Sequence, residues 1–172
     1  MLRAVRLATF GLCATVALLT APPALAQATP DYKTWLFAEG STNSTFGFEQ
    51  EVLIGNPNPT PVEITIEMFS QDGTNLGSVT RTIPALARYG EYVREIAGNQ
   101  AGVALKVTSS LPIVAERSMY WGNGLYRLAR NAGRVNDMRG GHNERGIDSG
   151  ARTLYFAEGE ARFFWTFFAV AN

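Results

Sequence analysis

The sequence predicts an all-β fold, an immunoglobulin-like antiparallel β-sandwich with an N-terminal signal peptide before it and an incomplete second repeat after it. Between residues 34 and 121, short apolar runs recur at a spacing of about ten residues, and turn residues separate them. No window shows a long 3.6-residue period, which argues against helices. A β-barrel is the alternative architecture for this pattern.

In chain order, the predicted strands cover residues 34–38, 46–54, 62–69, 76–83, 88–96, 102–108 and 113–121. The first is the apolar run TWLFA, and the second alternates from Phe46 onward. The third run alternates most clearly, and its apolar face carries Val62, Ile64, Ile66 and Met68. The last four are short apolar runs of similar length. Period-2 alternation with β-branched and aromatic residues is typical of half-buried antiparallel strands.

The connections between these runs consist of turn residues. Residues 56–61 contain three prolines, which lack a backbone donor and therefore exclude a helix or a central strand. Residues 71–74 predict a tight hairpin turn in which Gly73 supplies the positive φ. Pro112 separates the last two runs.

Residues 1–26 have the three parts of a secretory signal peptide. Two arginines make the start of the chain positive, residues 7–19 form an apolar segment, and Ala24 and Ala26 stand where a signal peptidase reads small residues. We therefore expect a cleaved signal peptide and a protein that is secreted, either extracellular or at the cell surface.

Two alternatives for this segment are weaker. A membrane anchor needs roughly 20 apolar residues, and this segment is shorter, so we expect no stable transmembrane anchor. A lipoprotein signal would use Cys13, but the bulky Leu12 precedes that cysteine where a small residue is needed.

The composition narrows the function classes. The 172 residues include 15 basic and 15 acidic side chains, one His and one Cys. This balance argues against a nucleic-acid partner, which usually requires a basic excess. One His and one Cys do not suffice for most metal or nucleophile chemistry, so we expect no metal, no cofactor and no enzyme activity. Removal of residues 1–26 would also remove the cysteine, Cys13.

Residues 122–152 differ from the strand pattern. They hold six arginines and frequent glycines, with few β-branched residues. We therefore expect a Gly/Arg-rich linker, within which 126–136 is a candidate for a short helix.

The chain then repeats itself. Residues 153–159 (TLYFAEG) match residues 34–40 (TWLFAEG) at an offset of 119. This predicts one β-sandwich module over 31–121 and the truncated start of a second repeat over 153–172. Two strands cannot bury a sandwich core. We therefore favour a fragment of a longer repeat protein, and the alternatives are that 153–172 packs on the first module or pairs with another chain in self-association.

Four motifs stand at separate places in the chain: FAEGST at 37–42, NP at 56–57, PIVAERSMYW at 112–121 and GGHN at 140–143. As a set, they resemble an uncharacterised bacterial secreted module that occurs in tandem repeats. The resemblance implies export and a repeated architecture. It implies no activity.

The carboxylates in these motifs have two interpretations. Glu39 and Glu116 would suit a glycosidase, which needs two carboxyl groups at a defined separation. We prefer structural ion pairs or inter-repeat contacts, with Arg117 or another arginine as partner. Glu158 repeats Glu39, and a residue repeated in an array is usually structural.

His142 lies in a glycine-rich segment with Glu144 and Asp148 nearby. A zinc site needs three or four ligands, mainly His or Cys, and calcium needs several oxygens at suitable spacing. We therefore interpret His142 as a structural turn residue between repeats and predict no metal site.

Four aromatic residues are candidates for ligand binding, because aromatic faces stack on sugar rings. They are Trp35, Tyr120, Trp121 and Tyr126.

These observations favour a non-catalytic secreted or cell-surface β-sandwich repeat module for adhesion, spacing or envelope association. Its expected partner is a cell-envelope polysaccharide or a surface protein. The alternative is a carbohydrate-binding accessory module of an extracellular enzyme. A hydrolase that uses Glu39 and Glu116 is the third hypothesis.

Overall fold

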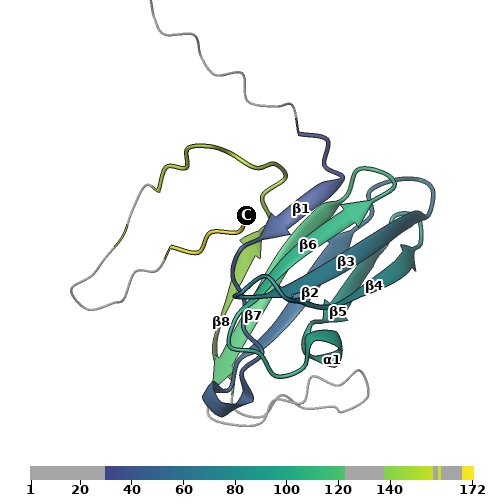
Figure 1. Cartoon of the computed structure of the whole chain (residues 1–172). Coiled ribbons are helices and arrows are strands. Elements are labelled where there is room, and N and C mark those ends of the chain that lie inside the picture. The colour runs from purple at the N-terminus through teal and green to yellow at the C-terminus, as the bar shows by residue number, and fades with distance from the viewer. Residues whose placement is uncertain (1–29, 123–137, 157–158, 160–167) are drawn as a thin grey trace, which may run out of the picture.

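A computed structural model describes residues 30–122, 138–156, 159 and 168–172 (Figure 1). Several predictions concern other residues and lie outside this part of the chain. They are the signal peptide over 1–26, the candidate helix over 126–136, and the roles of Tyr126 and Glu158.

The described residues form two four-stranded antiparallel sheets that pack as two layers (Figure 1). Sheet A has the order β1 (Thr34–Phe37), β6 (Val103–Ser109), β3 (Val62–Ser70) and β4 (Asn75–Ile83). Sheet B has the order β5 (Arg88–Tyr92), β2 (Glu49–Gly55), β7 (Val114–Gly122) and β8 (Met138–Arg145). The prediction of an all-β antiparallel sandwich is confirmed. In sheet A, β1 pairs with β6. The strand order of this sheet therefore differs from that of the A-B-E-D sheet of antibody domains.

All seven predicted strands are present, with two ends replaced by short helices. Residues 44–46 form the 3₁₀ helix η1 (Ser44–Phe46), because the Asn43 side chain accepts from the Thr45 N–H and Gly47 takes a left-handed conformation. After β5, the chain turns into α1 (Arg94–Ala97). The predicted hairpin turn is also present, and Gly73 has a φ of 83°.

The core lies between the two sheets and follows the alternation in the sequence. Every second residue of β3 from Val62 to Met68 is buried, and β2, β6 and β1 contribute in the same way. The largest buried apolar side chain is Trp35, which is 1% exposed. Burial of such side chains is the main stabilising contribution to a sandwich of this size.

The prediction of a linker over 122–152 is wrong for residues 138–147. Residues Met138–Arg145 form β8, which pairs antiparallel with β7 along its length. Past the end of β8, Ile147 exchanges two backbone hydrogen bonds with Leu36 of β1, at 2.7 and 2.9 Å. The module therefore extends to Ile147. A segment of glycines and polar residues becomes a strand because its partner β7 offers an unpaired edge.

Contacts between the sheets close both sides of the sandwich. At the β4–β5 side, Arg81 of sheet A and Glu91 of sheet B form an ion pair of 2.9 Å. The hydroxyl of Tyr89 donates to the same carboxylate oxygen at 2.5 Å. At the β1–β8 side, the Arg145 guanidinium lies 5.0 Å from the centre of the Trp35 ring, beside the Leu36–Ile147 hydrogen bonds. These contacts fix the two layers relative to each other.

The two ends of the sandwich differ in their loops. We call the end with loops 30–33, 56–61, 84–87 and 110–113 the proximal end, and the end with loops 38–48, 71–74 and 93–102 the distal end. Hydrogen bonds join the proximal loops into one surface: Leu86 N–H donates to Asn58 O at 3.1 Å, and Ile113 N–H to Tyr32 O at 2.9 Å.

Candidate functional site

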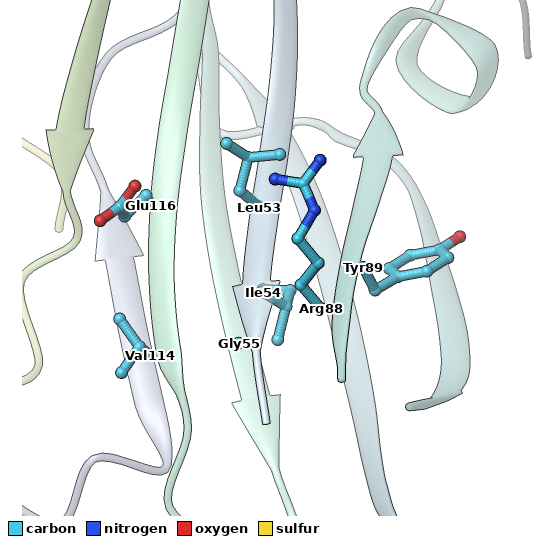
Figure 2. Close-up of a pocket in the computed structure, with 7 residues that line it drawn as sticks. All are labelled: Leu53, Ile54, Gly55, Arg88, Tyr89, Val114 and Glu116. Carbon is cyan, nitrogen blue, oxygen red and sulfur yellow. The ribbon is translucent and has the colours of Figure 1, made fainter. Parts of the chain in front are cut away.

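A shallow depression of ≈ 210 Å³ lies on the outer face of sheet B. Its apolar surface is formed by Leu53, Gly55 and Val114 (Figure 2). Its charged groups belong to Arg88 and Glu116. The strand register places these five on one face, because Gly55 is opposite both Arg88 and Val114, and Leu53 is opposite Glu116. Ile54 and Tyr89 complete the lining.

Acidic side chains continue along the same face of β2 toward the distal end. Burial raises the pKa of the Glu51 carboxyl, and the positive charge of Arg88 acts in the opposite direction. Burial also raises the pKa of Glu49, although Arg94 binds that carboxylate at 2.6 Å. The face therefore combines an apolar hollow with charges of both signs.

The two carboxylates considered for hydrolysis lie on different layers. Glu39 is exposed in the loop that follows β1 of sheet A, and Glu116 is exposed on the outer face of sheet B. The fold does not bring them together, so this geometry offers no acid–base pair of the kind that glycosidases use.

Arg117 is the member of the predicted ion-pair set that is fully buried, and its partner is Glu144. The distance between its Nη2 and the Glu144 Oε2 is 2.6 Å, and its Nη1 lies 3.6 Å from the Met119 sulfur. Sequence reasoning missed Glu144 as the partner because it treated β8 as linker. In the register of β7 and β8 the two residues are directly opposite.

The aromatic candidates separate into a core residue and a surface pair. Trp35 is buried, and its Nε1–H donates to Tyr32 O at 3.2 Å, so this ring offers no ligand surface. Tyr120 and Trp121 lie directly opposite Gly141 and Gly140 of β8. Each ring covers the glycine across from it, and Trp121 stays 37% exposed at the distal end.

The contact between Trp121 and β8 predicts a sensitive position. A Cβ at Gly140 would lie 2.7 Å from two carbons of the indole ring. Gly140→Val is therefore expected to lower the free energy of unfolding by about 2 kcal/mol, measured by urea denaturation. Gly150→Val is the control, because a Cβ there meets nothing within 4 Å. Equal losses in the two variants would contradict the contact.

His142 is exposed and lies within β8, opposite Met119. The predicted turn is therefore a strand. Among the described residues, no group of three or more His, Cys, Asp or Glu side chains is placed to hold a metal ion. In the same part of the chain, no helix is long and apolar enough to cross a membrane.

Comparison with known proteins supports the fold. No family model matches the chain, and no curated protein matches it. A solved structure described as Thermotoga maritima 1070 has 14% identity and a TM-score of 0.54, over 68% of this chain and 94% of that chain. The Anabaena sensory rhodopsin transducer has 21% identity and a TM-score of 0.44, over 49% of this chain and 93% of that chain. The chain is thus similar in fold to the Thermotoga protein.

Proposed function

We propose that the protein is a non-catalytic, secreted or cell-surface β-sandwich repeat module that displays its distal end for adhesion or envelope association. The observation that carries the proposal is the position of the two chain connections. The hydrogen bonds between Leu36 and Ile147 hold the outgoing chain against β1, which is the incoming strand. Leu36 is only two residues from Thr34, a distance of about 7 Å along the strand.

This arrangement favours display over spacing. A spacer gains length when the chain enters a module at one end and leaves at the other. Here both connections lie on the same side of the sandwich, and β8 runs toward the proximal end, where β1 starts (Figure 1). Each repeat therefore adds little to the end-to-end length of a tandem array. Its distal end extends away from the two chain connections.

The distal end carries two exposed aromatic side chains that suit a binding role. Phe46 is 68% exposed on η1, and Trp121 is 37% exposed at the end of β7. The loop after η1 lies against the end of β7, since a Cβ at Gly47 would lie 2.1 Å from the Gly122 carbonyl oxygen. Exposed aromatic residues on neighbouring segments are common in binding surfaces for proteins and sugars.

Binding to isolated cell envelopes tests the proposal. The labelled full chain is expected to sediment with envelope fractions, and Phe46→Asp to reduce the bound fraction about tenfold, because a charge would replace an exposed aromatic contact. Tyr32→Asp is the matched control, since Tyr32 is an aromatic residue that is 42% exposed at the proximal end. Absence of binding by the full chain, or equal losses in both variants, would contradict display of the distal end.

A carbohydrate-binding accessory module is the second candidate function, and the exposed face of Trp121 favours it. Retention on insoluble polysaccharide would distinguish the candidates. For this function, Trp121→Ala must abolish retention on the polysaccharide at a temperature at which circular dichroism shows that the variant is folded.

A further inference from the structure

Leu86 is an apolar side chain on a rigid turn at the proximal end. It is 75% exposed, and its φ of 53° lies in the left-handed region that leucine rarely adopts. The turn is held from both sides: Asn56 donates to Pro84 O at 2.8 Å and to Ala87 O at 2.9 Å. Residues held in a rarely populated backbone conformation cluster at functional sites, and here such a conformation presents a leucine to solvent.

The depression on sheet B lies beside this turn. Arg88 starts β5 two residues after Leu86, and Val114, 47% exposed, lines the depression at the start of β7. Leu86 is not part of the lining of the depression in its own module. One module therefore presents an apolar projection and an apolar hollow side by side, which are the two different patches that a heterologous contact between copies requires.

The length of the connection to the next repeat limits how far that repeat can lie from the depression. Ile147 is held on β1, and the second repeat begins at Thr153, which corresponds to Thr34. The six Cα–Cα steps from Ile147 to Thr153 span at most about 22 Å. The start of the next module is therefore confined near the proximal end of the first, and a short tether raises the effective concentration of a neighbour to about the millimolar range.

We propose that neighbouring repeats contact each other at their proximal ends, with Leu86 of one repeat inserted into the sheet B depression of the other. The inference rests on the proposed function, because it requires a tandem array of this module. The insertion covers Leu53 and Val114 with an apolar side chain and leaves Arg88 and Glu116 at the edge of the contact, where charges set orientation.

Disulfide trapping in a two-module chain tests this contact. The chain is the full sequence from residue 27 with one further copy of residues 34–152 inserted between Arg152 and Thr153, which preserves the natural connection. From residue 27 onward the sequence has no cysteine. Leu86→Cys is placed in one repeat and Val114→Cys in the other, in both arrangements. The control pairs Leu86→Cys with Phe46→Cys, which is exposed at the distal end.

In at least one arrangement, the disulfide between the repeats is expected to form at least about tenfold faster than in the control. Thermal melting verifies that each chain is folded. Rates no faster than the control in both arrangements would overturn the contact. The envelope-binding assay on the unmodified single-module chain is independent of this result, so failure of the contact and failure of the display function are distinguishable.

Discussion

Asn56→Leu is expected to lower the free energy of unfolding by about 3 kcal/mol. Asn56 is 3% exposed and holds the proximal loops together. Its Nδ2 donates to the carbonyl oxygens of Thr60, Ile83 and Pro84, at 3.0, 3.2 and 2.8 Å. Its Oδ1 accepts from the backbone and side-chain nitrogens of Asn58. Leucine has nearly the same size, but it would leave the buried carbonyl oxygen of Ile83 and several part-buried groups without their hydrogen bonds.

Urea denaturation of the full chain measures this loss, and Asn75 provides the control. Asn75 is exposed, and its Oδ1 accepts from the Gly77 N–H at 2.7 Å. Asn75→Leu is expected to cost less than about 1 kcal/mol, because water can replace the hydrogen bond. If the two leucine variants lose the same stability, Asn56 does not hold the proximal loops together.

The strands of the sandwich could be predicted because each one buries a single face. In β3 the alternation from Val62 to Met68 specifies both the strand and the side that faces the core. The turns at 56–61 and 71–74 were predictable for the same local reason, since proline and glycine restrict the backbone there. The helices η1 and α1 depend on capping and turn contacts over a few residues. Helices this short are not marked by a recognisable periodicity in the sequence.

The eighth strand could not be predicted from its own residues. Gly140, Gly141 and His142 have low β-propensity, and no alternation of apolar residues marks the segment. β8 exists because β7 presents an edge with Tyr120 and Trp121, whose rings fill the space above the two glycines. The first three residues of the GGHN motif at 140–143 pair with the MYW motif at 119–121. This relation between the two motifs can be recognised only when the strand register is known.

The candidate site was predicted in part. Trp121 was singled out as a binding residue and is exposed, whereas Trp35, singled out for the same reason, is a core residue. Both are aromatic residues on strands, and only the three-dimensional position distinguishes them. The depression on sheet B escaped prediction because its lining comes from three strands that are distant in the sequence.

The extent of the module gives the prediction with the largest effect. A chain that ends at Gly122 is expected to lose on the order of 5 kcal/mol relative to one that ends at Arg152, which is comparable to the whole stability of many domains. Without β8, the edge of β7 is unpaired and Arg117, fully buried in the sandwich, has no Glu144 carboxylate. Loss of one member of a fully buried ion pair costs about 3–5 kcal/mol, and the loss here lies toward the lower end because the Glu144 side chain is 50% exposed. Trp35 also loses the Arg145 guanidinium above its ring.

Circular dichroism and urea denaturation of the two shortened chains measure this difference. The chain ending at Arg152 is expected to match the full chain, because the large apolar residues of the second repeat that the structure describes, among them Tyr155 at 93%, are exposed. Arg117→Met in the full chain separates the two causes of instability. The apolar replacement of similar length removes the buried charge, and the Glu144 carboxylate that remains is 50% exposed and can be hydrated, so a change within about 1 kcal/mol is expected. If the chain that ends at Gly122 is as stable as the longer one, residues 138–147 are a linker, and the two chain connections are not held together on one side of the module.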